Sequence, residues 1–170
     1  GKASNIIGVE IFPPAAQQAN KTYDHVYVGN IESMELDYLE HFDFIICGDI
    51  IEHLVDPWRF VGRIHHWLKK DGTVLCTLPN IRFWLILYEI IFRGIWQYRD
   101  EGILDKTHLR FFTNKTAREM INGNKYVIIH TEIIIDGWKK KTMNIATGGM
   151  FKEFLGKQIL YVFKKQGECV

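Results

Sequence analysis

The segment from Phe42 to Pro57 constrains the fold more than any other part of the chain. It begins with a short apolar run, Phe44 to Cys47, which predicts a buried strand. A glycine and Asp49 interrupt that run, and an amphipathic helix follows from Asp56. Open α/β sheets build ligand sites in this way, at the carboxyl edge of strands that are followed by helices. The segment therefore predicts an α/β sheet with a ligand crevice beside Asp49.

The helix after this crevice has the clearest sequence signals in the chain. Asp56 is a natural N-cap, and Pro57 suits the first helical position. Its apolar side chains repeat at helical spacing: Phe60, Val61, Ile64, Trp67 and Leu68. We expect this helix to end in a left-handed turn at Gly72, after two lysines that suit the negative end of its dipole. A buried strand is expected directly afterwards, over residues 73–78.

Strands and helices alternate along the rest of the chain. Strands are expected at residues 5–10, 25–28, 126–135 and 158–163, and helices at 13–20 and 113–123. Residues 32–41 predict a loop or a short helix, and the polar, glycine-bearing residues 137–149 predict a loop. The alternation predicts a Rossmann-like, mostly parallel sheet with helices on both faces. The last two strands lack a clear helix between them, so we expect an antiparallel pair there.

Composition indicates one domain with a small-molecule partner. The 170 residues are enough to bury a core, and the net charge of +1 argues against a nucleic-acid-binding surface. The cysteines, Cys47, Cys76 and Cys169, lack metal-ligand spacing, which predicts neither a disulfide framework nor a zinc site and favours a reducing cytoplasm. The chain begins at Gly1 without a methionine, so we expect it to be an N-terminally truncated form of one domain.

From Asn5 to about Phe163 the chain resembles the class I S-adenosylmethionine-dependent methyltransferases. Four stretches in order carry the resemblance: Ile6–Glu10, Val28–Glu32, Phe42–Pro57 and Leu68–Asn80. The branch that contains quinone-biosynthesis and surface-polysaccharide methyltransferases is the most similar, and residues 102–113 resemble a substrate-side element of that branch. The resemblance implies S-adenosylmethionine as the cofactor, S-adenosylhomocysteine as the product, and O-methylation of a small-molecule, sugar or quinone-like acceptor.

The resemblance also implies where the cofactor binds. Glu10 would hold the ribose hydroxyls, Asn30 would stand beside the adenine where an aspartate is usual, and Asp49 would lie near the sulfonium. Each has a structural alternative: a solvated loop acid, a turn asparagine and a cap for the following turn, respectively. The full set of cofactor-binding residues that the resemblance implies is Glu10, Ile11, Asn30, Ile31, Asp49 and Ile50.

Candidates for the acceptor side come from histidine and its polar neighbours. His53, which follows Glu52, is a candidate base for the proton that leaves a hydroxyl acceptor; the alternative is that the pair stabilises the turn. Candidates for binding the acceptor are Asn80, His108 and Arg110. A loop-pinning role for His108 and Arg110, together with Asp105, is the alternative. We expect no metal site, because the His65-His66 pair has no further ligands at suitable spacing.

One expected part of the cofactor site is missing from the sequence. The glycine-rich loop, which lets backbone approach the methionine part of the cofactor, should precede the strand that ends at Glu10. Without its strand, either the flanking strands pair directly or another chain fills the gap. We therefore expect this polypeptide to be inactive by itself. The alternative is a non-catalytic dimerising or scaffold module. A nucleotide-linked oxidoreductase is a further alternative, against which the Asp49–Pro57 stretch argues.

Residues 81–112 are expected to form a lid or a substrate-side insertion. Their apolar part, Phe83 to Trp96, is interrupted by charged residues and is shorter than the ~20 residues of a spanning helix. Three alternatives stay open for it, in this order: packing or homodimerisation, a lid over the acceptor, and an interfacial membrane contact.

Overall fold

The computed structural model describes residues 3–166, and Cys169 therefore lies outside the described residues. The chain divides into two compact units, Gly1–Asp37 and Tyr38–Val170, and each is described by itself. The first unit contains a two-stranded sheet and the second a four-stranded sheet. The strand that ends at Glu10 belongs to the two-stranded sheet, and the strand that precedes Asp49 belongs to the four-stranded sheet.

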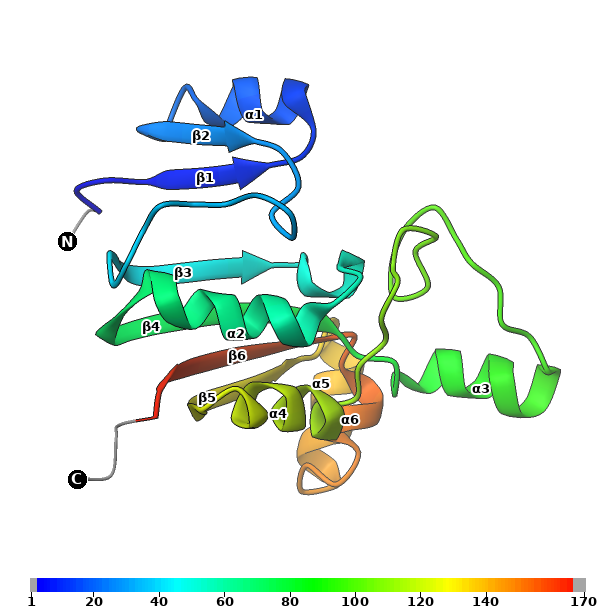
Figure 1. Ribbon diagram of the computed structural model, residues 1–170. Coiled ribbons are helices and arrows are strands. Elements are labelled where there is room, and N and C mark those ends of the chain that lie inside the picture. Colours follow the sequence, from blue (N-terminus) through cyan, green and yellow to red (C-terminus); the bar gives the residue numbers. More distant parts are fainter. Residues whose placement is uncertain (1–2, 167–170) are drawn as a thin grey trace. The chain divides into compact units, whose positions relative to one another are not determined.

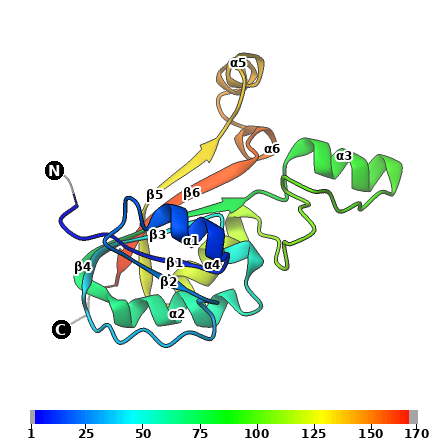
Figure 2. The ribbon, with the colours of Figure 1, turned by 90° about the horizontal axis from the view of Figure 1, so that it is seen from above.

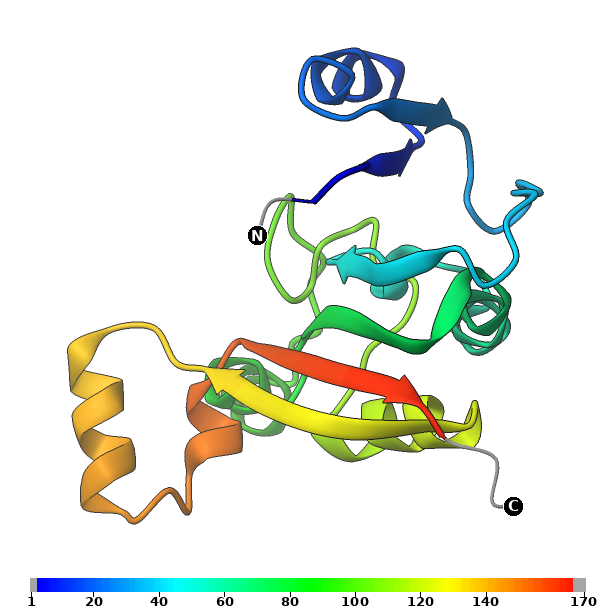
Figure 3. The ribbon, with the colours of Figure 1, turned by 90° about the vertical axis from the view of Figure 1, so that its left-hand side faces the viewer.

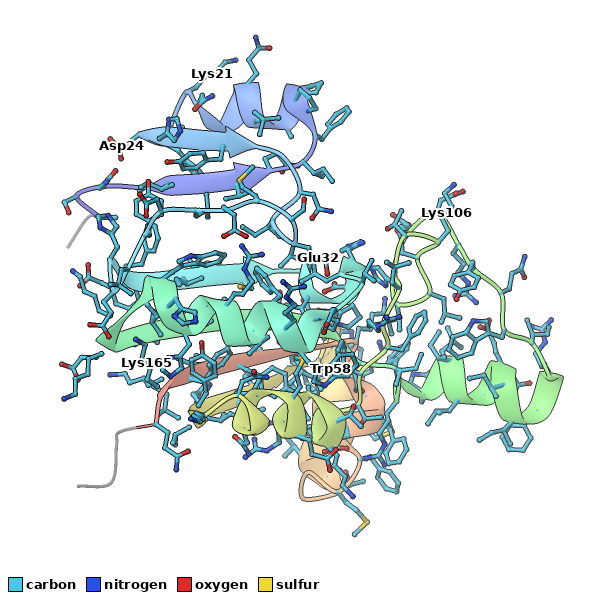
Figure 4. All side chains as sticks on the ribbon, in the orientation of Figure 1. Lys21, Asp24, Glu32, Trp58, Lys106 and Lys165 are labelled. Carbon is cyan, nitrogen blue, oxygen red and sulfur yellow. The ribbon has the colours of Figure 1, made fainter. Side chains whose placement is uncertain are left out.

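The first unit is a strand–helix–strand motif of the predicted kind (Figure 1). Strand β1 (Ile7–Glu10) leads into α1 (Pro13–Ala19), and β2 (His25–Val28) pairs parallel to β1. At the beginning of the two strands, Asp24 (labelled in Figure 4) accepts a hydrogen bond from the backbone N–H of Ile6 at 2.7 Å. Because the strands are parallel, their carboxyl ends lie at the same edge, with Glu10 opposite Val28.

The second unit is built on a second parallel pair. Strand β3 (Phe42–Gly48) pairs with β4 (Leu68–Pro79), and α2 (Pro57–Trp67) connects them. The predicted cap is confirmed, since Asp56 Oδ1 accepts from the backbone N–H of Arg59 at 3.0 Å. The predicted end of the helix is wrong: it ends at Trp67, because Leu68 adopts an extended conformation and pairs with Phe42.

Two antiparallel ladders complete the four-stranded sheet. Its order is β3-β4-β6-β5, so β6 (Gln158–Lys165) lies between β4 and β5 (Tyr126–Ile134), as Figure 3 shows. The predicted antiparallel pairing of β5 with β6 is confirmed. Helix α4 (Asn114–Gly123) precedes β5, and Thr113 begins it with a reciprocal capping box to Thr116. The predicted α/β class, with parallel and antiparallel strands, is confirmed.

Between β5 and β6 the structure has two helices, and the first of them lies where we predicted a loop over residues 137–149. Helix α5 (Trp138–Ala146) begins after Gly137, whose φ is 85°, and α6 (Lys152–Leu155) follows. Figures 2 and 3 show α5 beyond the end of β5 and away from α2. Lysine, methionine and alanine are good helix formers, and they outweigh the polar, glycine-bearing composition from which we predicted a loop.

The core of the second unit lies under one face of the sheet. Alternate residues of the two central strands are buried, namely Val74, Cys76 and Leu78 of β4 and Ile159, Tyr161 and Phe163 of β6. Helices α2 and α4 cover this face (Figures 1 and 2), whereas the intervening residues of both strands are only partly buried. In this unit, α2 and α4 therefore lie on the same face of the sheet.

The neighbouring cysteines behave as core residues. Cys47 of β3 and Cys76 of β4 are opposite each other in the ladder, and both are buried free thiols. Burial raises the pKa of the Cys47 thiol to about 12 and raises that of Cys76 well above its usual value. Both thiols therefore stay protonated and unreactive in the folded protein.

Helix α3 (Trp84–Arg93) belongs to the segment that we predicted as a lid or insertion. One side of it packs, through Phe83 and Ile86, on Leu104 in a small apolar cluster. The other side exposes large apolar residues, with Ile91 67% and Phe92 75% accessible. Gly94 ends the helix at φ 63°, a conformation that suits glycine. Within the described residues, no helix is long and apolar enough to cross a membrane.

Candidate functional site

The candidate site begins where β3 ends, at Asp49. This residue has a positive φ of 50°, an uncommon conformation for a residue with a side chain. Its backbone N–H donates to Thr77 Oγ1 at 3.0 Å, and its Oδ1 accepts from Thr77 Oγ1 at 2.9 Å and from Gln158 Nε2. Three neighbouring strands thus hold the Asp49 carboxylate at the carboxyl edge of the parallel pair, where the sequence predicts a crevice.

Glu52 is the buried acid of the site. It lies in the short 3-10 turn η1 (Ile51–His53) and is only 1% exposed. Neither oxygen of its carboxylate has a hydrogen-bond partner among the described residues. Burial, with a smaller contribution from the charge of Asp49, raises the pKa of Glu52 to about 7. An unpaired buried carboxylate is costly, so this position needs a proton or a positive partner.

Two histidines adjoin this acid. His108 is 8% exposed, and its Nε2 lies 4.0 Å from Glu52 Oε1. The ring of His53 meets the ring of His108 edge to face, with centroids 4.7 Å apart. The two chain segments are fastened together by their backbones, because the Glu52 carbonyl accepts from the N–H groups of Leu109 and Arg110 at 2.8 and 3.0 Å.

Hydrogen bonds orient both imidazole rings. His108 Nδ1 lies 3.0 Å from the carbonyl oxygen of Ile103, and His53 Nδ1 lies 3.2 Å from that of Thr107. A carbonyl can only accept, so each Nδ1 carries the proton and donates it. The Nε2 lone pair of each ring is then available to another group.

Glu52, His53 and His108 can each offer one ligand atom, and these atoms all lie within 4.8 Å of one another. Such a cluster has the chemistry to hold a divalent cation or to share a proton. We predicted no metal site. That prediction concerned the His65-His66 pair and did not consider this cluster. The sequence interpretation did not include Glu52 among the site residues, although its position directly before His53 was the available signal.

A pocket opens beside the cluster within the second unit. Asp49, Glu52 and His108 line one part of it. Another part is lined by side chains from the 81–112 segment and by residues near the ends of β5 and β6: Phe83, Leu85, Ile86, Arg99, Ile103, Ile134, Lys157 and Gln158. The apolar segment therefore contributes a wall to the pocket that the buried acid faces. Lys106 (labelled in Figure 4), further along this segment, pairs with Asp100 at 2.6 Å.

Two of the predicted acceptor-binding residues make structural contacts. Asn80 is completely buried; its Nδ2 donates to the carbonyls of Glu153 and Gly156 at 2.6 and 2.9 Å, and its Oδ1 accepts from the backbone of Arg82. Its amide is thus engaged inside the fold and not in the crevice where we expected it. The guanidinium of Arg110 donates to the carbonyls of Val55 and Leu109. This geometry matches the loop-pinning alternative.

The remaining cofactor candidates belong to the first unit. Glu10 ends β1, and its Oε1 accepts from the backbone N–H of Phe12 at 2.9 Å. Asn30 follows β2 and forms an Asx turn, in which its Oδ1 accepts from the backbone N–H of Glu32 at 2.9 Å. Ile11 is 67% exposed, and Ile31 is half-buried. Glu10 and Asn30 lie at the same edge of the two-stranded sheet, while Asp49 and Ile50 belong to the second unit.

Comparison with known families decides the affiliation. The model of a methyltransferase domain family matches residues 1–131. The chain belongs to the methyltransferase domain family. No curated protein matches the sequence of this methyltransferase domain at a significant level.

Solved structures with the same fold are methyltransferases as well. An S-adenosylmethionine-dependent methyltransferase from Archaeoglobus fulgidus superposes with a TM-score of 0.63 at 15% identity, covering 94% of this chain and 75% of that one. One from Mesorhizobium loti gives 0.65 at 12%, covering 96% and 81%. One from Thermotoga maritima gives 0.64 at 18%, covering 95% and 73%. At these identities the similarity establishes the fold of this methyltransferase domain, which is Rossmann-like.

Proposed function

We propose that this methyltransferase domain, when it has the glycine-rich loop, transfers a methyl group from S-adenosylmethionine to an oxygen atom of a small-molecule acceptor, and that this chain, in which the loop is missing, is inactive by itself. The observation that carries the proposal is the family match over residues 1–131. Its cofactor follows from the solved structures named above, which are described as S-adenosylmethionine-dependent. The acceptor class, a sugar or a quinone-like molecule, follows from the resemblance of residues 102–113 to a substrate-side element.

Each unit by itself has donors at its strand ends of the kind that this cofactor requires. Glu10 keeps Oε2 for a ribose hydroxyl, since its Oε1 is the atom that the Phe12 N–H approaches. Asn30 and Ile31 supply polar and apolar contacts suited to an adenine edge and face. Asp49 and Ile50 would stand on the side of the sulfonium, where the Asp49 carboxylate, fixed by Thr77 and Gln158, provides complementary charge. When bound, the cofactor supplies an electrophilic methyl carbon and a neutral leaving group.

The acceptor side is assigned to the pocket beside Glu52. Its apolar lining residues, Phe83, Leu85, Ile86 and Ile103, suit a ring or a hydrocarbon part of the acceptor. The reaction forms an oxygen–carbon bond in line with the breaking carbon–sulfur bond, and the hydroxyl proton must leave. His53 is our candidate to accept that proton at Nε2, because its Nδ1 is engaged by Thr107. Residues 81–112 are the proposed substrate-side segment.

Calorimetry tests the cofactor part of the proposal. S-adenosylmethionine and S-adenosylhomocysteine should each bind the chain at one site. Asp49→Asn keeps the hydrogen-bond acceptor but removes the charge, so it should weaken S-adenosylmethionine, which is a cation, more than S-adenosylhomocysteine, which is not. Asp100→Asn, in the surface pair with Lys106, is the matched control and should change neither affinity. Absence of binding by either molecule would contradict the proposal and favour the non-catalytic scaffold.

Transfer of a labelled methyl group tests the acceptor atom. A form of the domain that has the glycine-rich loop should methylate a hydroxyl compound such as a catechol, a phenol or a sugar in preference to the matched amine, and this chain, in which the loop is missing, should not. His53→Gln should lower the rate constant by about 10²- to 10⁴-fold if His53 accepts the proton. Methylation of the amine alone would contradict the choice of oxygen, while leaving the cofactor assignment standing.

A further inference from the structure

The cluster after β3 combines three ligand-type side chains with a buried acid that has no partner. Glu52 is shielded from solvent, and both of its carboxylate oxygens lack a hydrogen bond among the described residues. Its Oε1 faces Nε2 of His108 at 4.0 Å, which is longer than a hydrogen bond. The space between these two atoms is therefore bounded by a carboxylate oxygen and an imidazole lone pair.

We propose that Glu52, His53 and His108 bind a divalent cation of the first transition series, of the Zn²⁺ or Mn²⁺ class. One ligand atom from each residue lies within 4.8 Å of the other two. Ligands about 2.0–2.2 Å from a metal are at most about 4.4 Å apart, so a small rotation of the half-buried His53 ring would complete the site. Binding of the cation does not depend on methyl transfer.

The surroundings of the histidines match those of metal ligands. An imidazole that binds a metal through one nitrogen usually donates its other N–H to a carbonyl or a carboxylate. Here Ile103 and Thr107 provide those carbonyls, and both leave Nε2 for the metal. Behind the second carbonyl, Asp105 Oδ1 accepts from the backbone N–H and the hydroxyl of Thr107 at 2.7 and 2.6 Å. The rings are therefore oriented before any cation arrives.

The donor set selects the class of metal. Two imidazole nitrogens and one carboxylate oxygen are typical ligands of zinc, manganese, iron and cobalt, whereas Mg²⁺ and Ca²⁺ prefer all-oxygen sites. The carboxylate of Asp49 adds negative charge near Glu52. Glu52 and His108 also line the pocket, which gives a cation a route into the site.

Three protein ligands leave at least one coordination position for water or for an oxygen of another molecule. Since Glu52 and His108 line the pocket, that position would open toward it. A chelating acceptor, with two adjacent hydroxyl groups, is the chemical class that fits best. This extension rests on the proposed cofactor and acceptor, with His53 Nε2 as a metal ligand in place of its role as proton acceptor, whereas the cation site itself does not rest on the proposed function.

Calorimetry on the tag-free, chelator-treated chain tests the cation site. One equivalent of Zn²⁺ should bind, with Mn²⁺ weaker and Ca²⁺ weakest. Glu52→Gln and His53→Ala should each lower the Zn²⁺ affinity by about 100-fold or more, since changes to the outer shell alone cost about 10- to 100-fold. The matched control is Glu132→Gln, because Glu132 and His130 form an exposed pair 3.9 Å apart that has no third ligand among the described residues. This control should bind Zn²⁺ as the unaltered chain does.

Two results would overturn the cation site. If Zn²⁺ binds equally well to the unaltered chain and to both cluster variants, the ion is held by other histidines. If neither Zn²⁺ nor Mn²⁺ binds at millimolar concentration, Glu52 and His108 share a proton instead. Circular dichroism of Glu52→Gln and His53→Ala distinguishes loss of ligands from loss of fold. Binding of Zn²⁺ without binding of S-adenosylmethionine would leave this proposal intact and remove the proposed function.

A second titration tests the open coordination position. With Zn²⁺ bound, a catechol should bind more tightly than the matched monohydroxy phenol, and in the chelator-treated chain the two should bind equally. The preference should also vanish in Glu52→Gln. An equal affinity for both compounds in the Zn²⁺-loaded chain would overturn the assignment of a chelating acceptor.

Discussion

Nε2 of His108 lies 4.0 Å from Oε1 of Glu52, and the two side chains are only 8% and 1% exposed. The contact joins the turn after β3 to a loop from a distant part of the sequence. It places an acid that has no other partner against an oriented imidazole, at the edge of the pocket. The stability and the ligand chemistry of the site both depend on how the charge of Glu52 is balanced.

Replacing Glu52 with glutamine should stabilise the metal-free protein above neutral pH. Burial raises the pKa of Glu52 from 4.5 to about 7, so the unfolded chain loses this proton at a lower pH than the folded chain does. Between pH 4.5 and about pH 7, the Glu52 carboxyl therefore destabilises the folded state more as the pH rises. Above about pH 7 the destabilisation is constant. A shift of this size corresponds to about 3 kcal/mol. Denaturant unfolding in the presence of a chelator should show that Glu52→Gln has the higher free energy of unfolding near pH 8. Near pH 4 the variant and the parent protein should differ little.

The exposed Glu132 supplies the control for this measurement. Glu132→Gln should leave the free energy of unfolding within about 0.5 kcal/mol of the parent at both pH values. If Glu52→Gln instead destabilises the protein near pH 8, the carboxylate is stabilised in the fold by a positive group, and the balance described here is wrong.

Replacing Asn80 with alanine should destabilise the second unit strongly. The substitution leaves the carbonyls of Glu153 and Gly156 and the backbone N–H of Arg82 without their partner. Each buried group that loses a hydrogen bond in this way costs about 1–3 kcal/mol, so we expect a total of at least about 3 kcal/mol. Urea unfolding of Asn80→Ala beside Asn122→Ala, an exposed residue of α4, measures it. Equal stability of the two variants would contradict the structural role of Asn80.

Gly156 should not tolerate a side chain. A Cβ atom there would lie 2.2 Å from Cγ2 of Ile133 and 3.0 Å from the carbonyl oxygen of Ile134. Because β5 supplies both atoms, the strand must shift, and Gly156→Ala should cost about 1–3 kcal/mol in thermal unfolding. Gly123→Ala is the matched control: a Cβ atom there meets nothing within 4 Å, and alanine favours helix. A neutral Gly156→Ala would show that the contact between residue 156 and β5 is loose.

The two sides of α3 should respond differently to substitution. Ile86 is 3% exposed in the cluster with Phe83 and Leu104, so Ile86→Ala should cost about 2–4 kcal/mol. Phe92 is 75% exposed, and Phe92→Ser should change the free energy of unfolding by less than about 0.5 kcal/mol. Comparable losses for both variants would mean that the exposed side is covered in solution, which analytical ultracentrifugation of the parent protein would then reveal as self-association.

Most elements could be predicted because their signals are local. The cap at Asp56, the apolar repeat of α2 and the β-branched runs of β3 and β5 depend on neighbours within one or two turns. The end of α2 could not be predicted in this way. Leu68 fits the helical repeat, but its pairing with Phe42 of the neighbouring strand draws it into β4, and that is a tertiary contact.

The candidate site was predicted in its parts but not in its assembly. The strand ends identified Glu10, Asn30 and Asp49 as polar groups at a sheet edge, and the resemblance gave them roles. No local pattern could show that His108 lies beside His53. The hydrogen bonds that bring them together run from the backbone N–H groups of residues 109 and 110 to the Glu52 carbonyl, and these residues are far apart in the sequence. Asn80 illustrates the opposite case: a strand-end position suggested exposure, but the α6 region, from which Glu153 and Gly156 accept its hydrogen bonds, covers it.

The position of β4 has a consequence for synthesis of the chain on the ribosome. Its parallel partner β3 and the connecting helix α2 are translated before it, whereas its antiparallel partner β6 begins only at Gln158. Until that late strand emerges, the backbone donors and acceptors along one edge of β4 have no native partner. A nascent chain paused between Pro79 and Gln158 therefore presents an apolar edge of the kind that attracts wrong pairing or a chaperone.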